Sequence, residues 1–221
     1  MKITGICASP RGKNSNTLAL VKEGLKGAKD AGAETELIDI CKKDIRYCTG
    51  CSVCYETGKC IIKDDFEEIL DKLCSSDGII LGSPNYINSV TGQMKTFLDR
   101  MADCIHCQRL LGKYGFSVST AGGSNSVLVA GYLNQTLNVL GADTVGLVSI
   151  DIGVDPDLFQ ESIDYSYNTG ITLVNAIKEK RVYPEQKKFH DEMKSRMKML
   201  ILANKDNWIH EYDYWKDMGW I

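Results

Sequence analysis

The chain has 221 residues, with 29 acidic and 26 basic side chains and a net charge of −3. A chain of this length buries most of its apolar surface in one core. Its weak, mixed charge excludes the basic surface that nucleic acid or an anionic membrane requires. No apolar run reaches the roughly 18 residues of a membrane span, and Met1–Gly5 leads into a strand without a signal-peptide pattern. We therefore expect a cytoplasmic protein.

Strand and helix patterns alternate over the first two thirds of the chain. Short apolar runs predict five strands, at Ile3–Ala8, Glu34–Ile40, Asp77–Gly82, Tyr114–Thr120 and Thr144–Ile150. Helical patterns lie between them, at Ser15–Ala31, Asp64–Cys74 (capped by Asp64), Gly92–Arg100 and Ser126–Leu140. Strands that are apolar on both faces and separated by helices imply an α/β fold with a doubly wound parallel sheet.

The chain changes character after Asp151, so we divide it into a domain at 1–150 and a helical C-terminal extension at 151–221. Two helices are expected in the extension, at Asp157–Arg181 and Glu185–Asn204. An apolar aromatic stripe follows at near-helical spacing, formed by Trp208, Tyr212, Trp215 and Trp220. Such a stripe packs either on its own sheet or on another subunit; we favour another subunit.

The loop Ser9–Thr17 joins the first strand to the first helix and carries many hydrogen-bond donors. The first N–H groups of a helix lack intrahelical partners, and the helix dipole adds positive charge there. Arg11 contributes a charged fork, and hydroxyl and amide donors come from Ser9, Asn14, Ser15, Asn16 and Thr17. This loop is either an ordinary turn with an N-cap or a phosphate site.

Two familiar nucleotide motifs are excluded for this loop. A dinucleotide-binding turn needs G-x-G-x-x-G, and the loop has the single glycine Gly12. A Walker loop needs Gly-Lys-Ser/Thr, whereas Asn14 follows Lys13.

Two further loops end at the same edge of the predicted sheet. The stretch Gly82–Gly92 offers Pro84 and Tyr86 as rigid or flat surfaces, and backbone groups of 85–88 as hydrogen-bond partners. The stretch Ser119–Ser124 contains Gly122 and Gly123, which allow a close approach of the backbone to a ligand. Ligands of doubly wound sheets bind at the carboxyl ends of the strands, so the three loops together predict one site.

Four of the nine cysteines form a compact motif: Cys48, Cys51, Cys54 and Cys60, with spacing C-x2-C-x2-C-x5-C. Four thiolates this close in sequence can wrap one [4Fe–4S] cluster. Zinc is less natural, because structural zinc sites use two separated C-x-x-C pairs. Zinc and a disulfide switch stay open as alternatives.

The other cysteines and the histidines are less informative. Cys7 and Cys74 are interpreted as small core residues. The Cys104-Ile-His-Cys107 tetrad is a candidate second metal or disulfide site. No catalytic partner is evident for His106, His190 or His210, which we interpret as surface residues or as core residues with satisfied hydrogen bonds.

The stretch Ala8–Thr17 resembles the FMN-phosphate loop of the flavodoxin-like NAD(P)H-dependent FMN reductases. Pro84-x-Tyr86 and Thr120-x-Gly-Gly resemble the loops of that family that contact the isoalloxazine ring, and the similarity covers Lys2–Ile150. The four-cysteine spacing matches the iron–sulfur flavoproteins within it. The resemblance implies a flavodoxin-like fold with FMN at Ser9, Arg11, Asn14, Ser15, Asn16, Thr17, Pro84, Asn85, Tyr86, Ile87, Asn88, Thr120, Ala121, Gly122 and Gly123.

We therefore expect an FMN- and [4Fe–4S]-dependent oxidoreductase with no general acid or base. By resemblance, ferredoxin is a plausible one-electron donor, oxygen, peroxide or a quinone-like compound a plausible acceptor, and the protein a homodimer or homotetramer. One alternative is an NAD(P)H-dependent FMN or quinone reductase without a cluster. Another is a flavin and cysteine redox sensor.

Overall fold

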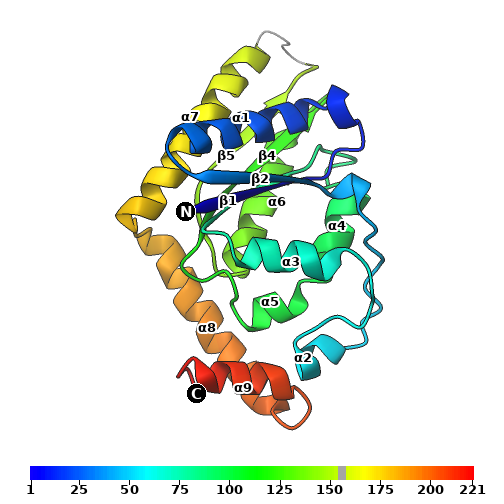
Figure 1. The fold of residues 1–221 in the computed structure, drawn as a ribbon, viewed down its shortest axis with the longest axis vertical. Helices are drawn as coiled ribbons and strands as arrows, with labels where there is room; N and C mark the ends of the chain where they lie inside the picture. The colour runs from blue at the N-terminus through cyan, green and yellow to red at the C-terminus, as the bar shows by residue number, and fades with distance from the viewer. Residues whose placement is uncertain (154–157) are drawn as a thin grey trace.

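The computed structural model describes residues 1–153 and 158–221 and contains one five-stranded sheet, whose strands are all parallel (Figure 1). The strand order is β2-β1-β3-β4-β5, which is the flavodoxin-like order. Both the predicted strands and the predicted fold are confirmed. The strands are β1 (Lys2–Cys7), β2 (Glu34–Asp39), β3 (Gly78–Gly82), β4 (Tyr114–Ala121) and β5 (Asp143–Asp151).

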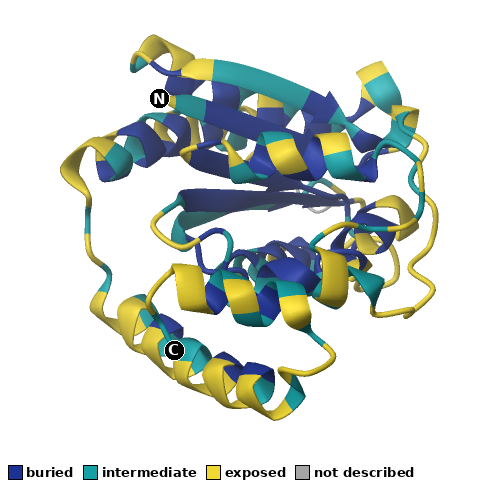
Figure 2. Cartoon of the chain, turned by 60° about the horizontal axis from the view of Figure 1, so that its bottom comes forward, coloured by how far each residue is buried: buried dark blue, intermediate teal, exposed yellow. Residues whose placement is uncertain are grey.

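The register brings the carboxyl ends of the central strands together. Cys7 of β1 lies beside Gly82 of β3, which in turn lies beside Val118 of β4. The loops that leave these strands therefore open at one edge of the sheet. All residues of β3 and β4 are buried, so these central strands are dark blue in Figure 2.

Helices α1 (Asn16–Asp30) and α7 (Leu158–Glu179) cover one face of the sheet. They cross closely, since a Cβ atom on Gly170 would lie 1.9 Å from the carbonyl oxygen of Gly24. Helix α7 therefore packs on the sheet domain together with α1. The expected helix start at Asp157 lies outside the described residues.

The opposite face is covered by α3 (Phe66–Cys74), α4 (Gly92–Asp99) and α6 (Ser126–Val139). The predicted cap of α3 is present in modified form: Asp64 accepts a 3.1 Å hydrogen bond from the N–H of Phe66. Beyond the sheet, the chain from β2 continues through η2 (Ile40–Lys42) into a cysteine loop, residues 43–65, which holds the short helix α2 (Val53–Thr57).

The aromatic stripe packs on its own chain. Helices α8 (Pro184–Asn204) and α9 (Ile209–Asp217) enclose Trp215, which is fully buried against Met197 and Ile201. Trp208 stacks on His106 of α5 (Ala102–His106), with ring centroids 5.1 Å apart. Our preference for another subunit as the cover of this stripe is wrong for these two tryptophans, because α8, α9 and α5 close on each other.

Within the described ranges, no helix combines the length and the apolar character that crossing a membrane requires.

Candidate functional site

A cavity of about 240 Å³, here named the strand-end cavity, opens at the carboxyl edge of the sheet. Its lining comes from the three loops that the sequence singles out and from a fourth that it does not. The lining residues are Ser9, Arg11, Ser15, Asn16, Thr17, Pro84, Asn85, Tyr86, Thr120, Ala121, Gly122, Ile152 and Gly153.

The first loop enters the cavity as the N-terminus of α1. Ser15 is the N-cap and accepts a 3.0 Å hydrogen bond from the N–H of Leu18. Asn16 and Thr17 are the first two residues of α1, so their N–H groups have no partner within the helix. Both residues line the cavity. The helix dipole favours an anion at this end, and the Arg11 side chain adds a positive charge to the wall. The loop therefore offers what a phosphate group requires.

The second and third loops are fastened to each other. The N–H of Asn85 donates a 2.8 Å hydrogen bond to the carbonyl of Thr120. The Asn85 side chain donates at 2.8 Å to the carbonyl of Ser124. The hydroxyls of Thr17 and Thr120 lie 2.7 Å apart, which joins the third loop to α1. Asn85 Oδ1, in contrast, is buried without a hydrogen-bond partner among the described residues, and an acceptor left free in a cavity wall fits a ligand with N–H groups.

Two glycines shape the far wall. A Cβ atom on Gly122 would meet nothing within 4 Å, so this glycine leaves open space beside the cavity. A Cβ atom on Gly153 would lie 1.7 Å from the carbonyl oxygen of Gly122. The loop after β5 therefore lies directly against the third loop, and the sequence analysis missed its residues, Ile152 and Gly153, because no motif marks them.

Four of the residues expected here do not line the cavity: Asn14, Ile87, Asn88 and Gly123. Ile87 and Asn88 form the tip of a turn, with φ angles of 52° and 58°, closed by backbone hydrogen bonds between Tyr86 and Ser89. The Asn88 side chain accepts a hydrogen bond from Asn125 at 2.9 Å. Ile87 is 100% exposed, in a conformation that is rare for a β-branched residue.

All four motif cysteines line a second cavity of about 80 Å³, here named the cysteine cavity. The loop curls tightly around it, because Gly50, Ser52 and Gly58 have φ angles of 66°, 61° and 73°. Cys48 and Cys51 are exposed, whereas Cys54 and Cys60 are half-buried. Further lining comes from Tyr55, Ile62, Asp99, Arg100 and Ala102.

The wall of the cysteine cavity includes a buried guanidinium that the sequence analysis did not identify. Arg100 Nη1 donates to Asp64 Oδ2 at 2.5 Å, and both side chains are fully buried. It also donates to the carbonyl of Arg46 at 3.3 Å, and the guanidinium lies 4.2 Å from the centre of the Phe66 ring. Arg100 Nε has no hydrogen-bond partner among the described residues. A cation with a free donor beside four thiols fits an anionic occupant of this cavity.

The pKa values of this region follow from burial and hydrogen bonding. Burial opposes ionisation of Asp64, but hydrogen bonds from Arg100 and from two backbone N–H groups outweigh it and lower the pKa of the carboxyl. Hydrogen bonds from the N–H of Val53 and the hydroxyl of Thr49 lower the pKa of Cys51. Burial raises the pKa of Cys54 to about 12. The thiolate form is thus favoured at Cys51, and a Cys54 thiolate needs a positive charge to stabilise it.

The sulfur atoms are spaced more widely than a single metal ion requires. A tetrahedral zinc ion with Zn–S bonds of about 2.3 Å places its sulfur ligands roughly 3.8 Å apart. No three of the four motif sulfurs lie within 4.8 Å of one another in the described chain. The spacing therefore does not match ligation of one zinc ion by three or four of these cysteines.

The two cysteines of the Cys104–Cys107 tetrad have separate surroundings. Cys104 belongs to the apolar core, where Cys74 packs against it. Cys107 Sγ lies 3.7 Å from Asp103 Oδ1, and burial raises the pKa of its thiol. Each histidine, interpreted from the sequence as a surface or satisfied core residue, lies near an acidic side chain. His106 lies 3.0 Å from Glu211, His190 3.7 Å from Asp143, and His210 3.6 Å from Asp103.

Comparison with known proteins decides the family. Residues 1–155 match the family model of the NADPH-dependent FMN reductases. The chain belongs to this family. Over the full length of both chains it is 37% identical to an iron–sulfur flavoprotein of Archaeoglobus fulgidus and 29% identical to one of Clostridioides difficile. Among solved structures, a flavone reductase superposes with a TM-score of 0.66 at 22% identity, over 80% of this chain and 63% of that one.

The predicted relationship, an iron–sulfur flavoprotein within the FMN reductase family, is confirmed by these matches. The protein is a flavin-dependent oxidoreductase, and its family binds FMN. The flavone reductase supports the flavodoxin-like fold alone, because its sequence identity is low.

Proposed function

We propose that this protein is an FMN- and [4Fe–4S]-dependent oxidoreductase that transfers electrons between a one-electron donor such as ferredoxin and a two-electron acceptor. The observation that carries the proposal is the pair of cavities in one chain: one lined by the FMN reductase loops, the other by all four motif cysteines. Flavin exchanges one or two electrons and a cluster exchanges one, so together they connect the two kinds of partner.

At the strand-end cavity, the residues of this chain bind and orient the flavin. The N-terminus of α1 and Arg11 hold the phosphate. Asn85 Oδ1, a buried acceptor with no hydrogen-bond partner within residues 1–153 and 158–221, takes a hydrogen bond from the ring edge. Pro84 and Tyr86 supply the apolar wall. FMN suits this cavity better than FAD, because the loops saturate one terminal phosphate. FAD in the extracted flavin, identified by chromatography, would contradict this assignment.

At the cysteine cavity, Cys48, Cys51, Cys54 and Cys60 are the proposed cluster ligands. Arg100 offsets their negative charge and holds the loop ends. Replacing any one of the four with alanine should lose or convert the cluster while FMN stays bound, because the two cavities share no residue.

A second candidate is an NAD(P)H-dependent FMN or quinone reductase without a cluster. The exposure of Cys48 and Cys51 favours it, since exposed thiols need no metal. The two candidates differ in colour and in donor. With the cluster present, visible absorption persists after the flavin is removed, and reduced ferredoxin outperforms NAD(P)H. If all visible absorption disappears when the flavin is removed, the protein has no cluster and is the NAD(P)H-dependent reductase.

We also propose a homo-oligomer in which the cluster of one subunit faces the FMN of another. Helix α4 lies between the two cavities of one chain. It begins after the flavin loop and ends beside Arg100, which lines the cysteine cavity. Its eight residues span about 12 Å. Large apolar side chains are exposed beside both sites. Tyr47 (80%) and Ile61 (53%) flank the motif, and Ile87 (100%) lies at the flavin loop. A contact between two subunits that sets the cysteine loop of one against the flavin loop of the other would cover Tyr47, Ile61 and Ile87.

Substituting Ile61→Asp tests this arrangement. We expect a smaller assembly in light scattering and slower cluster-to-flavin transfer, with both sites still filled. Leu202→Asp is the control, because Leu202 is 43% exposed on α8. A monomeric wild-type protein that transfers electrons at full rate would contradict the arrangement.

A further inference from the structure

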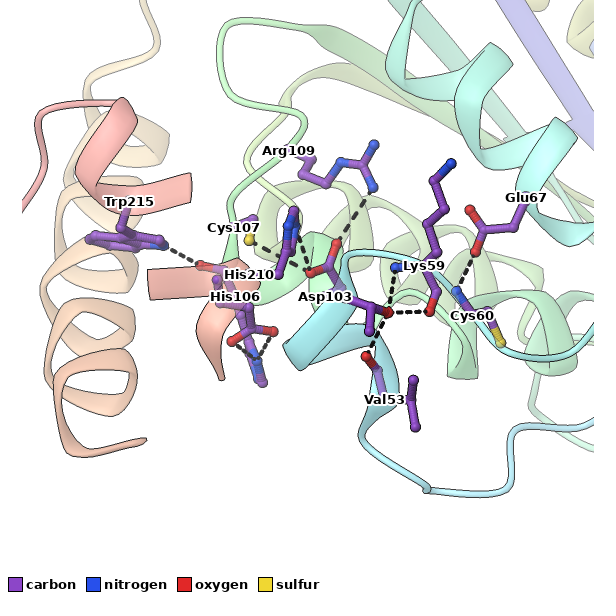
Figure 3. A network of polar contacts seen from close by, with 12 residues as sticks. Val53, Lys59, Cys60, Glu67, Asp103, His106, Cys107, Arg109, His210 and Trp215 are labelled. Carbon is purple, nitrogen blue, oxygen red and sulfur yellow. Dashed lines mark hydrogen bonds and ion pairs between the residues drawn. The ribbon is translucent and has the colours of Figure 1, made fainter. Parts of the chain in front are cut away.

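Three side chains of different chemistry converge beside the cysteine loop. Asp103 lies in α5, Cys107 directly follows that helix, and His210 comes from α9. Their ligand atoms all lie within 4.8 Å of one another, and no other such group occurs in the described parts of the chain. Figure 3 shows Cys107, His210 and Arg109 arranged around the Asp103 carboxylate.

Asp103 Oδ1 makes two contacts in this group. His210 Nε2 lies 3.6 Å away, longer than the about 2.7–3.2 Å of a good N–H···O bond, and the Cys107 thiol donates a hydrogen bond to it at 3.7 Å. With bond lengths of about 2.1 Å to N or O and 2.3 Å to S, two ligands of a tetrahedral zinc ion lie roughly 3.4–3.6 Å apart. The two separations measured from Asp103 Oδ1 are close to the edges of such a tetrahedron.

The carboxylate is also oriented for this role. Asp103 Oδ1 faces Cys107 and His210, while Oδ2 lies 3.5 Å from Arg109 Nη1. Arg109 beside Oδ2 orients the carboxylate and leaves Oδ1 directed at Cys107 and His210, as outer partners of metal ligands do. Asp103 and Cys107 are buried, and the His210 side chain is 32% exposed, which provides a route from solvent.

We propose that Asp103, Cys107 and His210 bind a zinc ion, with water as the fourth ligand. Imidazole, carboxylate and thiolate are all zinc ligands. On binding, the Zn–S bond forms as the Cys107 S–H bond breaks, and the proton leaves to solvent. One thiolate and one carboxylate balance the charge of the ion.

Zinc at this position joins two parts of the fold. Asp103 lies in the first turn of α5, Cys107 directly follows that helix, and His210 lies in α9, so the ion fastens the C-terminal helix to the core. The His210 ring also lies against the cysteine loop, since a Cβ atom on Gly58 would approach its atoms to 2.6 Å. The zinc site thereby supports the loop that carries the motif cysteines without using any of them.

Metal analysis of the full-length protein purified anaerobically, with its iron–sulfur loop intact, is the first test. We expect one zinc per chain in addition to any iron, and none in the Cys107→Ser protein. Cys41→Ser, at a half-buried cysteine outside the group, is the control and should retain zinc. A wild-type protein free of zinc after dialysis against zinc-containing buffer would overturn the proposal.

Cobalt titration is the second test, in the full chain with Cys48, Cys51, Cys54 and Cys60 all replaced by serine. One equivalent of Co²⁺ should give a thiolate charge-transfer band and raise the midpoint of thermal unfolding. Adding Cys107→Ser should abolish the band, whereas Arg109→Met should weaken binding about 10- to 100-fold, the usual effect of losing an outer partner. FMN binding verifies folding of each variant. A missing band in the folded serine variant would overturn the proposal. This second test does not depend on whether the motif carries a cluster, because the four motif cysteines are absent from it.

Discussion

Replacing Arg100 with methionine should release the ends of the cysteine loop. The guanidinium holds Asp64 at 2.5 Å and the carbonyl of Arg46 at 3.3 Å, which are residues on either side of the motif. Removing one partner of a buried ion pair costs about 3–5 kcal/mol, because the other charge stays buried without compensation. Asp64 keeps hydrogen bonds from the N–H groups of Arg46 and Phe66, at 2.9 and 3.1 Å. We therefore expect the low end of the range, about 3 kcal/mol.

Amide hydrogen exchange measures this change. At about 1.4 kcal/mol per factor of ten, the N–H of Arg46 should exchange roughly 100-fold faster in Arg100→Met, with β3 and β4 unchanged. Lys95→Met is the matched control on the same helix, since Lys95 pairs with Asp99 at the surface and such pairs contribute about 1 kcal/mol or less. Equal exchange rates of the Arg46 amide in Arg100→Met and wild-type protein would refute the idea that Arg100 holds the ends of the cysteine loop together.

Three further predictions concern the same sites. Gly153→Ala should weaken FMN binding at least tenfold in calorimetry, because its Cβ atom would lie 1.7 Å from the carbonyl oxygen of Gly122, whereas Gly131→Ala, with open space, should leave binding unchanged. Arg11→Ala should cost about 1.5 kcal/mol of FMN affinity, the low end for a charge-assisted hydrogen bond at an exposed residue; an unchanged Kd would remove Arg11 from the site. The lowered pKa of Asp64 stabilises the loop above the unfolded pKa of about 3.9, and this contribution is lost as the pH falls through the folded pKa. Protection of the Arg46 amide in cluster-free protein, corrected for intrinsic exchange, should therefore fall below pH of about 4, and a flat profile there would contradict the assignment.

The sheet and the position of the loop Ser9–Thr17 at its edge could be predicted because their signals are local. Apolar runs mark each strand, and the carboxyl ends of parallel strands must meet at one edge, so the sequence alone assigns Ser9, Pro84 and Thr120 to one site. The strand-end cavity contains all three. Ile152 and Gly153 could not be found in this way, because they line the cavity only through the pairing of β5 with β4.

The surroundings of the cysteines could not be predicted either, because they depend on contacts between distant segments. The sequence indicates only that Arg100 ends an ordinary helix, and it is the return of the cysteine loop that places Asp64 on it. Likewise, His210 has no neighbour in sequence that suggests a ligand role, and 107 residues separate it from Asp103. The short helices α2 and α5 carry too few residues for a periodic pattern.

The central claim, that FMN and a [4Fe–4S] cluster occupy one chain, is tested most directly by counting iron, acid-labile sulfide and flavin in anaerobically purified protein. We expect about four iron and about four sulfide per chain, together with one FMN, and loss or conversion of the cluster with retention of FMN in Cys60→Ala. Wild-type protein that holds FMN but neither iron nor sulfide would contradict the account.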